Sequence, residues 1–401
     1  MANAYTGTGS ATLGGTAGGA GLVQQAYDRL LEFALRSEPL IRSVADKTPA
    51  RQSIPGSTVV LQKYVDLEKN TTALSETTDP DAVALSTPTT VSITLNEYGN
   101  SVLVTRALEL FSLADVDPAI ANIIAFNLAD SIDDVAMTTL RGGTNKIFGG
   151  STATSTATIT AAATIDSADI RRAVAKLRAN KAIGRKGSLY WAGIHPEVSH
   201  DLRAESSSGQ GWLLPNQYGS SQDRIWAGEI GNYEGAYYVE SARLYNAKTG
   251  ADQTALATTA VTVAGTSAGF TFGVASSAVI ATRAEVGDKI SGTGIASTAK
   301  ISAISTTGST TTITVDVANT AAVTATTTVT VTPVTRVYNT IVCGQQAMAQ
   351  AVAEEPHVVI GPVVDKLMRH RPMGWYGVLG FARYREEALF RIETGSSIAA
   401  L

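Results

Sequence analysis

The chain has 401 residues and a formal net charge of −4, and 44% of its residues are hydrophobic. This hydrophobic share can bury a sizeable core, which excludes a disordered tail, and the net charge gives no general reason to expect a nucleic-acid binder. The lone Cys343 excludes an internal disulfide framework and a metal site built on a cysteine pair.

The first 21 residues are rich in Gly, Ala and Thr, which predicts a mobile or partner-bound arm. They lack a basic stretch followed by an apolar core, so no secretory signal is expected. No apolar run approaches the roughly 18–20 residues that span a membrane, so we expect a protein of a cytoplasm-like compartment without membrane insertion. Apolar residues at helical spacing predict a helix over residues 22–37, which Pro39 follows.

Two segments rich in β-branched residues, 57–69 and 87–105, predict long strands. Between them lie polar, turn-prone residues, and a structureless loop of that length usually serves a function or is ordered by a partner. An isolated two-stranded ribbon is marginal in water. We therefore expect a ribbon with a flexible tip that reaches away from its own core and lies on another surface.

Residues 115–143 predict one long helix that starts at Asp117-Pro118 and stops at two glycines. Its apolar stripe comprises Ile120, Ile123, Ile124, Leu128, Ile132, Val135 and Leu140. Asp130, Asp133 and Asp134 are expected on the side opposite the stripe. A di-metal helix bundle would need Glu-x-x-His motifs on facing helices, and the chain has none. The aspartates are interpreted as a solvated or subunit-facing edge, which is compatible with salt bridges to basic residues of a neighbouring subunit.

The following residues predict a mixed α/β region. A helix is expected over 166–183, a buried strand over 188–194, a short helix over 196–205, and a turn followed by a strand over 228–244. From about 248 to 335 the composition changes to Thr, Ala, Ser, Val and Gly with alternating apolar residues, which predicts an all-β insert. The earlier composition then returns, and the chain closes with a strand near 387–397.

No segment of the chain meets the requirements of a catalytic motif. "GTSAG" at 265–269 matches a nucleophile elbow, but a strand rather than a helix is expected after it, so a hairpin turn is the better interpretation. His195 and His200 are five residues apart, whereas helical metal pairs favour a spacing of four. The glycine-rich segments lack the strand and helix of a phosphate-binding loop. We expect no enzyme, no cofactor and no metal.

Several ordered segments resemble those of a known family. They are "HPEVSHDLR", "GEIGNYEGAYYVES", "TIVCGQQAMAQAV" and the tail "DKLMRHRPMGWYGVLGFARYREEALFRIETGSS". Together with the arm, the ribbon and the long helix, they resemble the major capsid proteins of tailed bacteriophages with the Hong Kong 97-type fold. The most similar subgroup is the one typified by the capsid protein of the podophage N-four. The departure from the family is the long insert, which is similar to β modules of phage surface and decoration proteins.

The resemblance implies an α+β chain of the Hong Kong 97-type phage capsid fold, with N-arm, E-loop, spine helix, and peripheral and axial domains, plus an inserted all-β domain. The expected divisions are 1–56 for the N-terminal arm with its helix, 57–105 for the E-loop ribbon, 106–247 for the spine helix and α/β core, 248–335 for the inserted surface domain and 336–401 for the return to the core. Only 16% of the residues are charged, which agrees with a surface covered by partners.

The function implied is that of a head protein that self-assembles into hexamers and pentamers of an icosahedral shell around double-stranded DNA. The DNA would be held non-specifically, and the portal and scaffold or decoration proteins would be further partners. The protein would be assembled in the host cytoplasm and reside in the virion, with no membrane partner. The alternative is another repeating virion or surface protein, such as a tail-tube or adhesin-like subunit with a β module.

Assembly contacts are expected at charged residues of the ribbon and of the long helix. These residues are Lys63, Glu68, Lys69, Asp79, Asp81, Asp130 and Asp134. Some capsids of this fold crosslink a Lys to an Asn between subunits, but no crosslink is predicted here because no partner asparagine can be named.

Overall fold

The computed structural model of the protein describes residues 39–49, 58–64, 66–67, 69–71, 73–74, 76–77, 83–106, 116–150, 153–204, 229–362, 367 and 369–398. The described residues form two compact units. Those between 97 and 129 and between 356 and 377 make up the smaller unit, and the others make up the larger unit.

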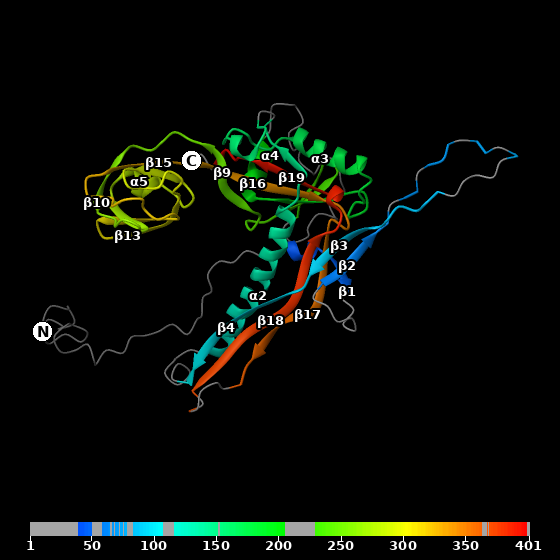
Figure 1. Ribbon diagram of the computed structural model, residues 1–401, viewed down its shortest axis with the longest axis horizontal. Coiled ribbons are helices and arrows are strands. Elements are labelled where there is room, and N and C mark those ends of the chain that lie inside the picture. Colours follow the sequence, from blue (N-terminus) through cyan, green and yellow to red (C-terminus); the bar gives the residue numbers. More distant parts are fainter. Residues whose placement is uncertain are drawn as a thin grey trace, which may run out of the picture. The chain divides into compact units, whose positions relative to one another are not determined.

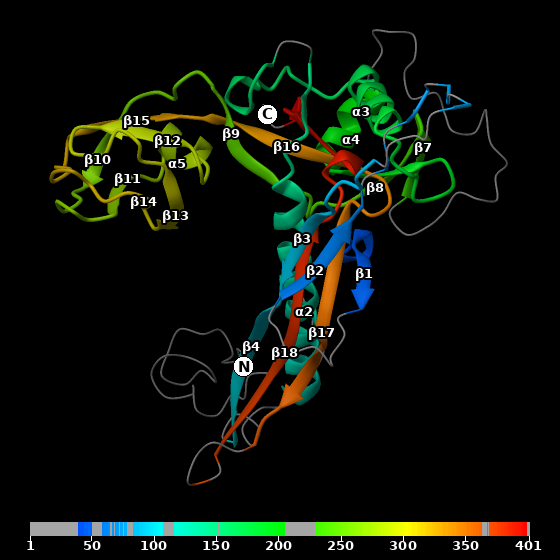
Figure 2. The same cartoon turned by 45° about the vertical axis from the view of Figure 1, so that its right-hand side comes forward.

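The larger unit is built on a seven-stranded mixed sheet with the order β5-β19-β16-β6-β8-β7, and β9 joins it by pairing with β16 (Figure 1). Its strands are β5 (Lys146–Phe148), β6 (Tyr190–Ile194), β7 (Glu229–Tyr233), β8 (Ala236–Glu240), β9 (Asn246–Asp252), β16 (Val334–Cys343) and β19 (Leu389–Thr394). Helices α3 (Ser167–Ala179) and α4 (Pro196–Ala204) lie beside it (Figures 1 and 2). Both helices, β6 and β19 confirm the elements predicted from the sequence.

Helix α3 shows how the sequence directs this packing. The Asp166 carboxylate accepts a hydrogen bond from the Asp169 N–H at 2.8 Å and starts the helix. The apolar side of the helix, which includes the fully buried Ile170 and Leu177, packs in one cluster with Tyr238 of β8. The prediction for residues 228–244 was incomplete, because β7 and β8 form a hairpin whose turn, at Glu234 and Gly235, has positive φ at both residues.

A four-stranded sheet has the order β1-β17-β18-β4. Its strands are β1 (Asp46–Pro49), β4 (Asn96–Thr105), β17 (Met348–Ile360) and β18 (His370–Arg383). Strand β1 pairs in parallel with β17, and the preceding 3-10 helix η1 (Ile41–Val44) buries two side chains in the larger unit's core. The expectation that an arm extends to residue 56 was therefore wrong for residues 41–49, which belong to the chain's own fold. The predicted helix over 22–37 lies outside the described residues.

Helix α2 (Val116–Arg141) confirms the long helix predicted over 115–143. It buries Ile124 in the smaller unit, and Ile132 and Leu140 in the larger unit. The predicted stripe was too wide, because Ile123 is 47% exposed.

The prediction for Asp133 was wrong, because its side chain is buried rather than on a wet face. The carboxylate accepts a hydrogen bond from the Arg42 N–H at 2.9 Å, so η1 covers this side of α2. Sequence periodicity cannot reveal a cover that comes from residues 91 positions away.

The ribbon consists of β2 (Thr58–Lys63) and β3 (Thr89–Thr94), paired antiparallel from Thr58↔Thr94 to Lys63↔Thr89. It is shorter than predicted, because β4 joins the four-stranded sheet instead of extending the ribbon. Every second side chain of the ribbon points to the same face, and this face packs on β17 and β18. The cluster there contains Val59, Leu61, Ile93, Leu95, Ala349, Ala351, Ala382 and Tyr384.

Residues 259–332 contain a six-stranded sheet with the order β12-β15-β10-β11-β14-β13. Its strands are β10 (Thr259–Val263), β11 (Thr271–Ala275), β12 (Lys289–Gly292), β13 (Ile301–Thr307), β14 (Thr310–Val315) and β15 (Thr328–Thr332). The sheet has its own apolar cluster, which includes the fully buried Val274 and Ile313. It also carries a short helix, α5 (Val279–Arg283), which the all-β prediction missed. "GTSAG" lies in the connection between the paired strands β10 and β11, as predicted.

The ribbon lies very close to β18 at Gly380. A Cβ added there would stand 2.1 Å from the carbonyl oxygen of Thr94, so a side chain would force the ribbon away from the sheet. We expect Gly380→Ala to lower the free energy of unfolding by about 1–3 kcal/mol, the usual cost of overpacking. Hydrogen exchange of residues 58–63 and 89–94 should also accelerate. Gly308→Ala is the control, because a Cβ at Gly308 meets open space and its cost is strain at φ +59° alone. Unchanged ribbon exchange in Gly380→Ala would contradict the close packing.

Candidate assembly surfaces

The histidines that the sequence singled out are held by structural contacts. His195 is 7% exposed, its Nδ1 accepts the Glu197 N–H at 3.3 Å, and its ring lies 4.9 Å from that of Tyr338. Burial lowers the pKa of His195, which favours the neutral imidazole. His200 Nδ1 lies 3.4 Å from Asp201 Oδ1. Within the described part of the chain, no three His, Cys, Asp or Glu side chains converge on a metal position.

None of the described helices is both long and apolar enough to cross a membrane.

The end of the ribbon next to residues 64–88 is fixed to the larger unit by polar contacts, in addition to the apolar face of the ribbon. Lys63 Nζ lies 3.1 Å from Glu387 Oε2, and the Tyr384 hydroxyl donates to the Gln62 carbonyl at 3.5 Å. The pKa of Glu387 is lowered by a hydrogen bond from the Glu387 backbone N–H and by a hydrogen bond from Lys63. Lys63 therefore has a partner within the chain, which the sequence did not reveal because Glu387 is 324 positions away.

Beyond the ribbon, residues 64–88 expose large apolar side chains. Figure 1 shows the described part of this segment in blue, extending outward from the ends of β2 and β3. The exposed fractions are 65% for Tyr64, 55% for Leu67, 69% for Leu74, 71% for Val83 and 67% for Leu85. Five large apolar side chains exposed along one segment make this segment a candidate interaction site. We call residues 64–88 the extended loop.

Among the charged residues predicted as contacts in the extended loop, the structure describes Lys69 alone. Lys69 is exposed. Glu68, Asp79 and Asp81 lie outside the described residues. Their assembly role stays a prediction.

Arg243 gathers the aspartates of α2. Its guanidinium pairs with Asp130, lies 3.5 Å from Asp133 Oδ2 and lies 3.9 Å from Asp134 Oδ1. Arg243 is 10% exposed, whereas Asp134 is 77% exposed and keeps an accessible carboxylate. Burial raises the pKa of Asp133, while the Arg42 N–H and Arg243 oppose that rise. The sequence missed Arg243, because a single Arg in "SARLY" carries no signal for a partner on another element.

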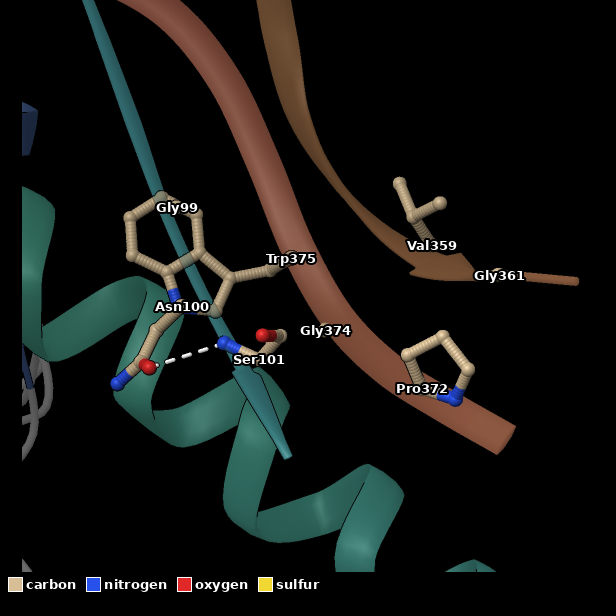
Figure 3. Close-up of a pocket in the computed structure, with 8 residues that line it drawn as sticks. All are labelled: Gly99, Asn100, Ser101, Val359, Gly361, Pro372, Gly374 and Trp375. Carbon is tan, nitrogen blue, oxygen red and sulfur yellow. Dashed lines mark hydrogen bonds between the residues drawn. The ribbon is translucent and has the colours of Figure 1, made fainter. Parts of the chain in front are cut away.

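The smaller unit contains a hollow of about 400 Å³ lined by three glycines. Figure 3 shows Gly99, Gly361 and Gly374 around it, together with Val359 and Pro372. The glycines permit close strand packing, since a Cβ on Gly374 would stand 2.5 Å from the Asn100 carbonyl oxygen. They add no side chains of their own, so the hollow stays open between the side chains of Asn100, Ser101, Val359, Pro372 and Trp375. We call it the glycine hollow.

One wall of the glycine hollow is rigid. The Trp375 indole N–H donates to Asn127 Oδ1 at 2.9 Å, and the Asn100 amide donates to the same oxygen at 3.3 Å. Trp375 is 5% exposed and packs with Val104, Ile124 and Met373. Exposed apolar side chains of the same unit are Val102, Leu103, Ile123, Val358, Val359, Ile360 and Leu367.

Comparison with known proteins gives concordant results. Residues 50–399 match the family model described as "Phage capsid protein". No curated protein matches the chain. Among solved structures, the capsid of Ralstonia phage GP4 is 13% identical with a TM-score of 0.59, covering 93% of this chain and 95% of that one. The capsid of cyanophage P-SCSP1u is 12% identical with a TM-score of 0.54, covering 95% of each chain. The head structure of Helicobacter pylori bacteriophage KHP40 is 11% identical with a TM-score of 0.54, covering 93% of this chain and 96% of that one. At these identities the structures show a shared fold.

The Arg243 cluster gives a test of subunit stability. Arg243→Gln leaves the buried Asp133 without its counter-charge, so we expect a loss of about 3 kcal/mol in the free energy of unfolding. Because the pKa of Asp133 in the folded chain lies above its unfolded value, this carboxylate costs stability as the pH rises. Removing the guanidinium increases that cost, so the deficit should be larger at pH 8 than at pH 5, as measured by denaturant unfolding.

Arg203→Gln is the matched control, since the Arg203 side chain is 48% exposed and lies 3.8 Å from Glu240. Such a surface pair contributes about 0–1 kcal/mol. A deficit in Arg243→Gln no larger than that of the control, or one independent of pH, would refute the role assigned to Arg243.

Proposed function

The chain belongs to the phage capsid protein family, and from this membership we propose that it is the major capsid protein of a tailed bacteriophage, with the Hong Kong 97-type fold. Hexamers and pentamers of the subunit build an icosahedral shell that encloses double-stranded DNA without reading its sequence. The portal and scaffold or decoration proteins complete the particle, which is assembled in the host cytoplasm. The role of the chain is structural rather than catalytic.

The family match over residues 50–399 carries this proposal, and the apolar exposure of the extended loop supports the assembly mechanism. Burying a large aliphatic or aromatic side chain contributes about 1.5–3 kcal/mol, and the chain leaves five of them in water between residues 64 and 85. A repeating shell supplies a neighbouring copy at every loop, so a closed symmetric assembly buries all of them at once. Subunit association then gains the free energy of burying these side chains, which the isolated subunit does not gain.

The glycine hollow of a neighbouring copy is the acceptor that we propose for the extended loop. The hollow is open enough to admit protruding side chains, and Val359, Pro372 and Trp375 give its lining apolar surface beside the polar Asn100 and Ser101. Charge supports the same pairing. Between 64 and 88 the loop has five acidic residues and one Lys, whereas Arg369, His370 and Arg371 precede Pro372 of the hollow. Opposite charges favour this docking and oppose self-association of the loops.

We further propose that an inserted domain projects from the outer surface of the shell, with the predicted bounds 248–335 narrowed to 253–333 because β9 and β16 belong to the seven-stranded sheet. The domain has its own core, and its ends are adjacent because Asp252 of β9 is the register partner of Val334 of β16. Adjacent ends are the condition for inserting a domain without disturbing its host.

Shortening the extended loop tests the proposed function. Replacing residues 70–86 by a short Gly/Ser linker should abolish shells in electron micrographs of the purified protein. The melting temperature of the subunit should stay unchanged, because the large apolar side chains described in this segment, Leu74, Val83 and Leu85, are exposed in the isolated chain. A mock variant that replaces only the polar residues 70–72 should still assemble. Normal shells from the shortened chain, or loss of its melting transition, would overturn the proposal.

Deleting the inserted domain gives an independent test. Residues 253–333 are replaced by Asn-Gly, a two-residue hairpin turn. Lys248 and Arg336 become threonine in the same variant, since their partners Glu285 and Asp288 lie in the deleted segment. We expect shells of the natural diameter that lack an outer projection in cryo-microscopy images. A subunit that no longer folds would show that the segment is part of the core.

A further inference from the structure

The six-stranded sheet is joined to the larger unit by a stem of two paired strands. Strand β9 leads out to the sheet and β16 leads back (Figures 1 and 2). Relative motion is the default for a domain on a narrow connection, unless a large apolar interface prevents it. Beside the stem, the described residues line a cleft of about 690 Å³, and most of this lining is polar or charged. The groups available at this cleft to limit such motion are therefore mainly polar and charged.

Two basic residues stand opposite each other on the stem. Lys248 of β9 and Arg336 of β16 are direct register partners in the antiparallel pair. Like charges in this position destabilise a pair of strands. The arrangement therefore calls for anions between the two side chains.

The segment between α5 and β12 supplies these anions. Glu285 Oε2 lies 3.0 Å from Lys248 Nζ and 3.0 Å from Arg336, so one carboxylate bridges both cations. Asp288 Oδ1 lies 2.5 Å from Lys248 Nζ. The hydrogen bond from Lys248 is the largest cause that lowers the pKa of Glu285.

Asp288 is hydrogen-bonded both to its own segment and to strand β16 of the stem. It is fully buried, its Oδ2 accepts the Glu285 N–H at 2.8 Å, and its Oδ1 accepts the N–H of Val334 on β16 at 3.1 Å. The Lys248 side chain is only 10% exposed, so water screens this pair weakly. A cation of the stem and an anion of the segment that leads into β12 are thus in direct contact.

We propose that Lys248, Arg336, Glu285 and Asp288 form an ionic latch that fixes the six-stranded sheet in one orientation on the stem. The latch makes the domain a rigid projection instead of a module that swings on two strands. It is a property of the single subunit, and it holds whether or not the subunit builds a shell. Lys289 and Asp252 also pair at the junction, but both are about half exposed, so this pair contributes little.

A distance measurement between spin labels tests the latch. Labels are attached to Ala175→Cys on α3 and Ser305→Cys on β13, two exposed positions, and the buried Cys343 stays unlabelled. The labelled full chain is diluted into an excess of unlabelled chain, so that only distances within one subunit are recorded. We expect one narrow distance distribution in the natural sequence. In Lys248→Met combined with Asp288→Asn, which removes both buried charges, the distribution should broaden at least about twofold as free domain motion returns.

Two further variants keep the result interpretable. Lys289→Met removes an exposed ion pair at the same junction and should leave the distribution narrow. Glu285→Gln removes the bridge between the two cations without emptying a buried site, and it should also broaden the distribution. A circular dichroism melt of each variant checks that the sheet remains folded. A broad distribution in the natural sequence, or a narrow one in both Lys248→Met/Asp288→Asn and Glu285→Gln, would overturn the latch.

Discussion

The extended loop has apolar side chains that its own chain cannot bury, and this constraint organises the rest of the structure. Leu74, Val83 and Leu85 are exposed in the isolated chain, and exposed apolar side chains of this size favour association. The ribbon that carries the loop is held in two ways, by its apolar face on β17 and β18 and by the pair of Lys63 with Glu387. The close approach at Gly380 is part of this packing, because the ribbon must lie flat on the sheet to bury Ile93. The extended loop therefore starts from a ribbon that is packed on the sheet, and we propose that a neighbouring copy buries it.

Few residues are charged, and several of the charged side chains pair with one another within the subunit. Only 16% of the residues are charged, and several of them meet at junctions between elements. Arg243 ties three aspartates of α2, and Lys248 ties the six-stranded sheet to its stem. Both cations are about nine-tenths buried, where screening is weak and a missing partner is costly. Such pairs fix orientation, whereas the apolar loop supplies association. Orientation and association thus depend on different residues, which allows each to be altered without the other.

The sequence predicted the elements whose signals are local. Helix α2, helix α3 with its Asp166 cap, and the alternating strands of residues 259–332 all follow from periodicity and turn chemistry. The order of these elements, together with the tail motifs, also indicates the family. Predictions failed where a distant segment decides the outcome. Asp133 is buried because η1 covers it, β4 leaves the ribbon for another sheet, and Arg243 gains its role from a helix more than a hundred positions earlier. The glycine hollow was invisible for the same reason, since its glycines come from three separate strands or strand ends.

The central claim is that a neighbouring copy buries the extended loop, and thiol accessibility measures this directly. In Leu74→Cys the new thiol sits on a side chain that is 69% exposed in the subunit. Cys343 is an inert background, because complete burial raises its pKa to about 12. A maleimide reagent should label the free subunit at once and the assembled particle far more slowly. Equal labelling rates in subunit and particle would contradict the account, because the loop would then remain in water after assembly.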